Sequence, residues 1–390
     1  MIIGIDGSRA NRKIKTGVEW YAYHLIQELK KITVNDSNHY FLYTDKPLKG
    51  DLARLPENWQ EKILRWPFRY LWTKIRLSWE MLREKPDVLF IPSHTLPIFF
   101  PKKTIITIHD LGYERYPETY SFFARYHLRQ GYKFAAKHAT KIIVPTEFTK
   151  RELISLYNTK PEKIEIVHLG YNDKIFKKVD DEIKINKVLE KYKIKKPYLL
   201  FTGRIETKKG IRCLIEAYKL LITNSQWQNL NLVLIGGRGF GYKEIKSEIR
   251  KLKNCVHELG HLTREEDRAY LYTSTAGFIF PSLYEGFGIP ILEAMACGVP
   301  VIASDLEPIR EIIGGKYLDR EKVGTEISRE ITAILVPPEN PEVLAQKIKE
   351  VLENQELRQQ LITKGLERVK NFSWQKCAEE TLKILKSLYD

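Results

Sequence analysis

Hydrophobic positions along the chain fall into two kinds of pattern. Short runs rich in Val, Ile and Leu, which are typical of buried strands, alternate with longer stretches whose apolar residues recur at helical spacing. This alternation predicts βαβ units with parallel sheets, and hence an α/β fold. In the first half, the predicted strands are residues 2–6, 40–44, 87–91, 104–109, 141–145 and 164–168, and the predicted helices are 18–31, 119–137 and 146–157.

The alternation stops at residues 172–196, a polar stretch rich in Lys and Asp that we interpret as a linker with room for one helix. It then resumes, and residues 340–390 are predicted to be entirely helical. A chain of 390 residues also exceeds what one hydrophobic core usually supports. We therefore predict two doubly wound, Rossmann-like domains in tandem. The strands of the second are predicted at 198–202, 230–236, 255–259, 276–281, 299–304 and 333–337.

The loop after the predicted strand 276–281 carries the most informative motif, because ligands of such sheets bind beyond the carboxyl ends of the strands. Gly286 and Gly288 allow a close backbone approach, and Pro290 favours the first turn of a helix whose N–H groups and positive dipole end face the same point. These features predict an anion site. Glu285 and Glu293 flank it, and since carboxylates repel phosphate, we expect them to accept hydrogen bonds from hydroxyl groups. The alternative is a solvated loop carboxylate and a simple complement to the helix dipole.

The spacing Glu-x7-Glu within EGFGIPILEAMACGVPVIAS, residues 285–304, resembles the signature of the retaining glycosyltransferase family 4, whose members have the GT-B fold of two Rossmann-like domains facing across a cleft. The resemblance covers nearly the whole chain. It implies that Glu285 contacts the transferred sugar, that Glu293 contacts the ribose, and that the backbone amides of Phe287, Gly288 and Ile289 bind the diphosphate.

With the linker, the resemblance divides the chain into three segments. We expect an acceptor-side domain at residues 1–178, a donor domain at 179–371, and a last helix at 372–390 that returns to the first domain.

A second loop, residues 203–210, places cations between a predicted strand and a helix. By resemblance, Arg204 and Lys209 neutralise the donor diphosphate and stabilise the charge of the departing nucleotide. A solvated basic turn is the alternative. Gly236 and Leu262 resemble residues of the loops that hold the base and the ribose in this family.

In the first half, the resemblance assigns two further residues. Family members usually have two adjacent glycines after the first strand, whereas this chain has only Gly17, so Lys13 or Lys15 is a candidate substitute. His109, in the sequence His-Asp-Leu, corresponds to the histidine that contacts the sugar. A structural histidine at a strand end is the alternative.

Retention suggests front-face attack, in which the leaving phosphate takes the proton of the acceptor and no protein nucleophile is needed. The chain has no Asp-x-Asp motif. We therefore expect no metal and no cofactor besides the nucleotide sugar, since Arg204, Lys209 and helix amides would balance the diphosphate charge.

Charge and cysteine content bear on partners and location. The formal charge of +15 is concentrated in residues 1–180, which hold 31 Lys and Arg against 20 Asp and Glu, an excess of +11. Such a field attracts nucleic acid, anionic lipid or a phosphorylated substrate, and charge does not choose among them. The four cysteines form no C-x-x-C pair, which favours a reducing cytoplasm. Since no secretory signal and no apolar run of about 18 residues occurs, we expect a cytoplasmic protein that does not span the membrane.

Residues 62–85 contain seven basic and two acidic residues, interleaved with aromatic ones. This mixture suits the inner face of an anionic membrane or a lipid-linked phosphate acceptor. It also resembles a surface for single-stranded nucleic acid, a partner that we do not expect. The other alternative is core, because several apolar residues recur at helical spacing. The aromatic residues are Trp66, Phe68, Tyr70, Trp72 and Trp79, and those at helical spacing are Leu71, Trp72, Ile75, Trp79 and Leu82.

These observations predict a retaining hexosyltransferase that uses a nucleoside-diphosphate sugar. GDP-mannose is favoured over a UDP-sugar, because the His-Asp-Leu sequence resembles mannosyltransferases of cell-surface polysaccharide assembly. The expected acceptor is a glycan or a lipid-linked molecule in polysaccharide or glycolipid synthesis. The alternatives are a sugar-nucleotide epimerase or phosphorylase of the same fold, and a non-catalytic relative that binds a nucleotide sugar or nucleic acid.

Overall fold

The computed structural model describes residues 1–68, 71–252, 255–314 and 332–388. It divides into two compact units. Unit 1 comprises Met1–Glu114, Ser121–Gly170 and Phe372–Asp390, and unit 2 comprises Arg115–Tyr120 and Tyr171–Asn371. The main division therefore falls after Gly170, whereas the sequence places it after residue 178.

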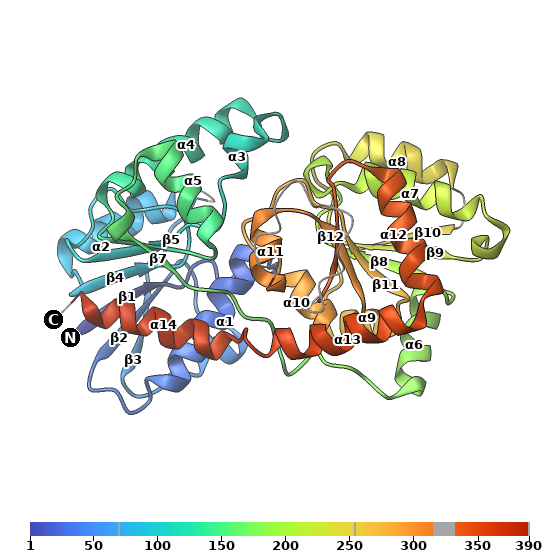
Figure 1. The fold of residues 1–390 in the computed structure, drawn as a ribbon. Coiled ribbons are helices and arrows are strands. Elements are labelled where there is room, and N and C mark those ends of the chain that lie inside the picture. Colours follow the sequence, from blue (N-terminus) through green and yellow to red (C-terminus); the bar gives the residue numbers. More distant parts are fainter. Residues whose placement is uncertain (69–70, 253–254, 315–331, 389–390) are drawn as a thin grey trace. The chain divides into compact units, whose positions relative to one another are not determined.

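Unit 1 is built on a sheet of seven parallel strands in the order β3-β2-β1-β4-β5-β6-β7 (Figure 1). The sequence analysis missed β3, because its sequence Trp-Gln-Glu-Lys-Ile is apolar only at its ends. A strand at the edge of the sheet needs little burial, so its polar pattern is tolerated there. The strands are β1 (Ile2–Asp6), β2 (His39–Thr44), β3 (Trp59–Ile63), β4 (Val88–Ile91), β5 (Thr104–Thr107), β6 (Lys141–Val144) and β7 (Ile164–Ile166).

Helices cover both faces of this sheet (Figure 1). The C-terminal helix α14 packs against α1, and the Trp374 ring stacks on His24 with 5.3 Å between centroids. Gly170 passes close to α14, since a Cβ at this position would lie 2.2 Å from the Trp374 nitrogen. The helices are α1 (Gly17–Ile32), α2 (Ser78–Arg83), α3 (Gly112–Arg115), α4 (Phe122–His138), α5 (Glu147–Tyr157) and α14 (Trp374–Ser387), with short turns η1 (Gly50–Ala53), η2 (Trp72–Leu77) and η4 (Pro161–Lys163).

The basic aromatic segment 62–85 does not form a regular amphipathic helix. Its residues 72–77 form a π-helical turn that continues into α2. Because a π turn holds more residues than an α turn, it shifts the buried positions to Trp72, Leu77 and Met81. The core interpretation therefore holds for Trp72 and is wrong for four residues that are 43% to 59% exposed: Leu71, Ile75, Trp79 and Leu82. Tyr70 lies outside the described residues.

Unit 2 has a sheet of six parallel strands in the order β10-β9-β8-β11-β12-β13. The predicted linker contains one helix, α6, which packs on α9. The strands are β8 (Tyr198–Thr202), β9 (Asn231–Ile235), β10 (Val256–Gly260), β11 (Gly277–Phe280), β12 (Val301–Ser304) and β13 (Ile334–Val336). The helices are α6 (Glu182–Tyr192), α7 (Ile211–Ile222), α8 (Tyr242–Lys251), α9 (Glu265–Thr273), α10 (Ile289–Ala296), α11 (Glu307–Ile313), α12 (Pro341–Glu353) and α13 (Gln355–Val369), with η3 (Pro117–Thr119), η5 (Thr207–Lys209) and η6 (Ser225–Trp227).

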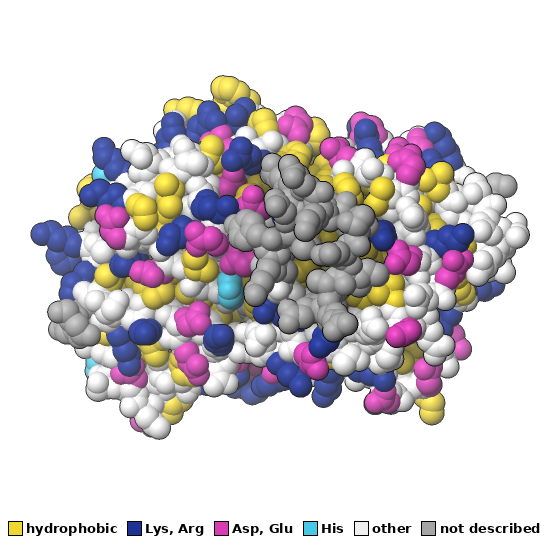
Figure 2. Space-filling view, in the orientation of Figure 1, with side chains coloured by type: hydrophobic (Ala, Val, Ile, Leu, Met, Phe, Trp, Pro, Cys, Tyr) yellow, Lys and Arg dark blue, Asp and Glu magenta, His cyan; other side chains and the backbone are white. Residues whose placement is uncertain are grey.

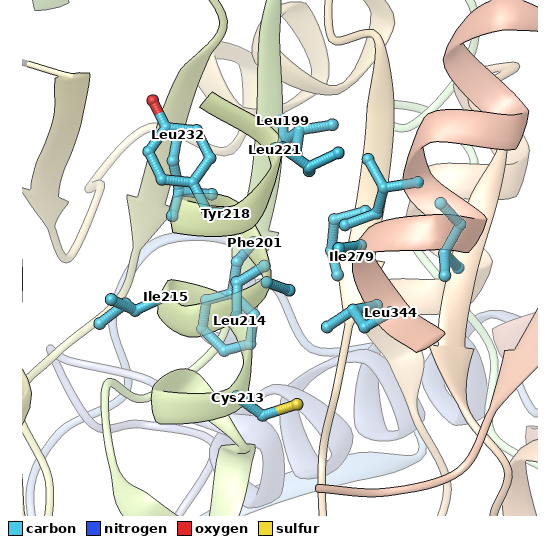
Figure 3. Close-up of a cluster of buried hydrophobic side chains, with 14 of the residues drawn as sticks. Leu199, Phe201, Cys213, Leu214, Ile215, Tyr218, Leu221, Leu232, Ile279 and Leu344 are labelled. Atoms are coloured by element: carbon cyan, nitrogen blue, oxygen red, sulfur yellow. The ribbon is translucent and has the colours of Figure 1, made fainter. Parts of the chain in front are cut away.

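An apolar cluster of unit 2 lies between its sheet and helices α7 and α12 (Figure 3). Leu214 and Tyr218 of α7 and Leu344 of α12 meet Phe201 of β8 and Ile279 of β11, and all five side chains are buried. This packing fixes β8 and β11 side by side.

The strand orders define where ligands are expected. In unit 1 the connections diverge between β1 and β4, and in unit 2 they diverge between β8 and β11. Open parallel sheets bind ligands at such switch points, beyond the carboxyl ends of the strands. We therefore expect the ligand site of unit 2 in the loops that follow β8 and β11.

Candidate active site

The loops after β8 and β11 are joined by short backbone contacts. The Leu283 N–H donates a hydrogen bond of 2.9 Å to the Lys208 carbonyl. Gly210, with φ +66°, lies so close to the other loop that a Cβ would be 1.8 Å from the Pro281 oxygen. Glycine is thus required at this position, and the two loops form one continuous surface at the switch point.

Lys209 and Glu285 meet on this surface. The Lys209 ammonium donates to the Glu285 carboxylate at 2.6 Å, and the side chains are only 16% and 12% exposed. Lys209 also lies over the Phe280 ring, 5.8 Å from its centroid. The pair places a cation suited to phosphate next to a carboxylate suited to a hydroxyl group.

Helix α10 begins beside this pair. Gly288, with φ +129°, precedes the helix, and Pro290 occupies its first turn. The N-terminus of α10 therefore points its positive dipole end at the loop that carries Glu285. Phe287 has a buried side chain, so only its backbone is available for the predicted diphosphate contact, together with those of Gly288 and Ile289.

Glu293 lies within α10 and is 5% exposed. The Tyr272 hydroxyl donates to its Oε2 at 3.0 Å, and an Arg268 nitrogen lies 3.6 Å from its Oε1. Burial raises the pKa of Glu293, and the Arg268 charge opposes that rise. The carboxylate is thus held from one side by α9.

The other predicted residues of unit 2 also follow strand ends. Arg204, after β8, is 60% exposed and lies 3.5 Å from the Glu206 carboxylate. Gly236 directly follows β9 with φ +148°. A Cβ there would be 1.8 Å from the Gly203 oxygen, so glycine permits the close approach of the loop after β8. Leu262, after β10, is buried. All nine residues predicted for the donor domain therefore lie in segments that follow the carboxyl ends of strands of this one sheet.

Two tyrosines from residues 115–120 contact the same loops within unit 2, and sequence reasoning missed them. The Tyr116 hydroxyl donates to the Leu283 carbonyl at 3.0 Å. The Lys208 ammonium donates to the Tyr120 hydroxyl at 3.3 Å. Each tyrosine thus holds a residue one or two positions from Lys209 or Glu285. The segment follows His-Asp-Leu in the sequence, which was the available signal.

In unit 1, His109 follows β5 and is partly buried. Burial lowers its pKa to about 4, partly offset by Asp110 and by a hydrogen bond to the backbone of Pro92. Its Nε2 is buried and has no hydrogen-bond partner among the described residues. The Tyr21 ring packs edge-on against it, with 4.6 Å between centroids. His109 is therefore neutral near pH 7, and its Nε2 is a buried polar atom to which no described residue bonds.

His94 lies near His109 and was not singled out from the sequence. It follows β4 by three residues, and burial lowers its pKa to about 4, with Arg9 and His109 contributing in the same direction. Arg9, after β1, is paired with Glu19 of α1 at 3.2 Å. A histidine just beyond the strand 87–91 was a usable signal, because it lies on the same edge as His109.

Gly17, the remaining predicted contact, is the first residue of α1 and is exposed. A Cβ there would meet no atom within 4 Å, so packing does not require glycine. Lys13 is exposed, whereas the Lys15 ammonium donates to the Arg12 carbonyl at 2.9 Å and lies over the Trp20 and Tyr23 rings. Of the two candidate substitutes, Lys13 is the more accessible.

Comparison with known proteins identifies the family. The profile described as Glycosyl transferases group 1 matches residues 182–368, and the one described as Glycosyltransferase Family 4 matches residues 15–174. O-antigen chain mannosyltransferase B of Escherichia coli is 27% identical over 316 residues, which cover 80% of this chain and 77% of that protein.

Solved structures agree on the fold. Sucrose-phosphate synthase (tll1590) from Thermosynechococcus elongatus superposes with a TM-score of 0.75 at 22% identity, covering 100% of this chain and 99% of that one. Anabaena Alr3699/HepE in complex with UDP-glucose gives a TM-score of 0.73 at 18% identity, with 99% of each chain covered. The chain therefore belongs to the group 1 glycosyltransferases and has their two-domain GT-B fold.

Proposed function

We propose that the protein transfers a hexose, with retention at the anomeric carbon, from a nucleoside-diphosphate sugar to a glycan or lipid-linked acceptor in the synthesis of a cell-surface polysaccharide or glycolipid. GDP-mannose is the favoured donor and a UDP-sugar is the second candidate. The similarity to an O-antigen chain mannosyltransferase supports the first, and the UDP-glucose complex of Alr3699/HepE supports the second.

The observation that carries this proposal is the contact between Lys209 and Glu285. The Lys209 ammonium and the Glu285 carboxylate are in contact at the switch point of the unit 2 sheet, next to the N-terminus of α10. A nucleoside-diphosphate sugar offers a phosphate beside a ring of hydroxyl groups, which matches this pair of charges. Epimerase and phosphorylase activities remain the alternatives of the same fold.

In the proposed reaction, the bond between the anomeric carbon and the β-phosphate oxygen breaks while an acceptor hydroxyl attacks from the same face. The hydroxyl proton passes to the leaving phosphate. Lys209, Arg204 and the N-terminus of α10 stabilise the negative charge that collects on the diphosphate, so the proposed reaction requires no metal ion. Glu285 orients the sugar, and we assign His109 a further hydroxyl contact with it.

Acceptor dependence separates the candidate reactions. The purified protein is incubated with GDP-mannose or a UDP-hexose, with and without a glycan or lipid extract as acceptor, and the products are followed by NMR. We expect release of the nucleoside diphosphate to depend on the acceptor and the new linkage to keep the donor's anomeric configuration. Conversion of the donor without any acceptor would favour an epimerase instead.

We also propose that unit 1 associates with anionic membranes. Leu71, Ile75, Trp79 and Leu82 are exposed, and the Ile98 N–H donates to Ser78 at 2.7 Å, which adds the exposed Ile98 and Phe99 to the same surface. Exposed aromatic residues beside lysines and arginines also occur on α4, and Figure 2 shows such a mixture over the upper part of unit 1. Among the described residues, no helix is long and apolar enough to cross a membrane.

Vesicle sedimentation tests this association. We expect salt-sensitive binding to vesicles that contain anionic phospholipid and weaker binding to zwitterionic ones. Trp79→Ser should reduce the bound fraction severalfold, whereas Leu220→Ser, which alters an exposed leucine of α7 in unit 2, should not. Equal binding of both variants, or none by the wild type, would exclude the proposed surface.

A further inference from the structure

The buried Glu293 carboxylate has two polar partners on helix α9. Arg268 and Tyr272, one turn apart on α9, approach its two oxygens separately: the tyrosine hydroxyl at 3.0 Å from Oε2 and the guanidinium at 3.6 Å from Oε1. A carboxylate accepts about four hydrogen bonds, so acceptor capacity remains on both oxygens.

Arg268 is itself held in place. Its Nη2 donates to Glu265 at 2.6 Å, and its guanidinium lies over the Phe176 ring at 4.9 Å from the centroid. Asn172 donates to the other Glu265 oxygen at 3.2 Å. Residues of the segment that enters unit 2 thus brace the arginine behind Glu293.

Tyr272 is fixed in the same way. Its ring packs against Phe176 and Phe278, and its hydroxyl shares a hydrogen bond with Thr202, the last residue of β8. Thr202 directly precedes the loop that carries Arg204 and Lys209. One network therefore connects the carboxylate on α10 with the start of the proposed diphosphate loop.

These contacts preserve the charge and the orientation of the Glu293 carboxylate. A buried carboxylate whose partners move would lose its charge or its direction, and either change weakens the hydrogen bonds it offers to a ligand. The two fixed donors occupy part of the acceptor capacity of the carboxylate and leave the rest for a ligand.

We infer that Arg268 and Tyr272 are positioning residues that aim the Glu293 carboxylate at the ribose hydroxyls of the nucleotide, and thereby set a preference for ribonucleotides over nucleotides that lack those hydroxyls. The inference rests on the proposed function, in which Glu293 contacts the ribose. It adds two residues that never touch the nucleotide and yet control how its sugar is recognised.

Calorimetric titration with GDP, UDP and their 2′,3′-dideoxy counterparts tests the inference on the whole protein. The wild type should bind the better ribonucleotide roughly tenfold or more tightly than its dideoxy form, since hydrogen bonds to a charged acceptor are involved. Tyr272→Phe and Arg268→Met should lose most of this ratio while binding the dideoxy form with wild-type affinity. Lys219→Met, which breaks a 2.6 Å ion pair with Glu248 on the outer helices, should keep the ratio.

The remaining outcomes distinguish failure of the positioning role from failure of the proposed function. If both variants weaken the ribo and dideoxy forms by the same factor, or keep the wild-type ratio, the positioning role is wrong and the proposed function stands. Tyr272→Phe keeps the ring packing, so it decides the matter if Arg268→Met does not fold. A wild type that binds both forms equally would remove Glu293 from the ribose. A wild type that binds neither GDP nor UDP would overturn the proposed function along with the inference.

Discussion

Lys209 and Glu285 lie 2.6 Å apart at the carboxyl edge of the unit 2 sheet, although 76 residues separate them in the sequence. Each satisfies the charge of the other in a largely enclosed position. A donor diphosphate would replace Glu285 as the partner of the Lys209 ammonium, and the Glu285 carboxylate could then accept a hydrogen bond from a sugar hydroxyl. In the proposed reaction, the pair thus contacts both sides of the bond that breaks, Lys209 the diphosphate and Glu285 the sugar.

Lys209→Ala should weaken the binding of the nucleoside diphosphate by about 10- to 100-fold, because one charge-assisted hydrogen bond to phosphate is lost. Titration calorimetry measures the change. Lys219→Ala is the matched control, since it removes a lysine with an equally short ion pair on α7. Unchanged affinity in Lys209→Ala would remove this residue from the diphosphate site.

Glu285→Gln should lower turnover strongly while leaving the affinity for the nucleoside diphosphate at the wild-type level or above it. The reason is that Lys209 loses a competing partner, whereas the sugar loses its charged acceptor. Steady-state kinetics and titration of the same preparation separate the two effects. A variant that turns over normally would refute the sugar contact.

Tyr116→Phe should lower kcat by a few fold with little change in nucleotide affinity, because the hydroxyl that holds the Leu283 carbonyl also steadies the loop that carries Glu285. Tyr242→Phe removes a hydroxyl that bonds to Glu258 on the edge strand and serves as the control. Equal kinetics of both variants and the wild type would show that the Tyr116 contact has no part in catalysis.

Acid should destabilise unit 1 through His94 and His109. Burial lowers both pKa values to about 4, whereas an unfolded histidine titrates near 6.5. The unfolded state therefore binds more protons between these values, and stability falls as the pH drops from about 6.5 to about 4, by up to about 3 kcal/mol for each histidine. Urea unfolding at pH 7 and pH 4.5 measures this loss, which His94→Gln should reduce. An equal loss in the variant would exclude His94 as a source.

Much of the fold follows from the chain's periodicity. The alternation of apolar runs and amphipathic stretches predicted twelve of the parallel strands, because buried parallel strands are continuous apolar segments. β3 escaped because an edge strand can be polar. The exposed face of residues 71–82 was also unpredictable, because the spacing of apolar residues does not reveal a π turn.

The site residues were found through glycines, prolines and charges that follow strand ends, as with Gly288 before α10. Their partners were not predictable. Tyr116 reaches Leu283 across 167 residues, and Arg268 reaches Glu293 from a different helix. Such contacts depend on how strands are ordered in the sheet, which local patterns do not specify.

Binding of nucleoside diphosphates tests the central claim most directly. Thermal unfolding is followed with GDP, UDP, ADP and dTDP, on the wild type and on Lys209→Ala. At about 100 times its dissociation constant, the matching diphosphate should raise the unfolding temperature of the wild type by roughly 5–10 °C, and that of Lys209→Ala far less. No shift with any of the four, or an equal shift in the variant, would contradict a donor site built on Lys209 and Glu285.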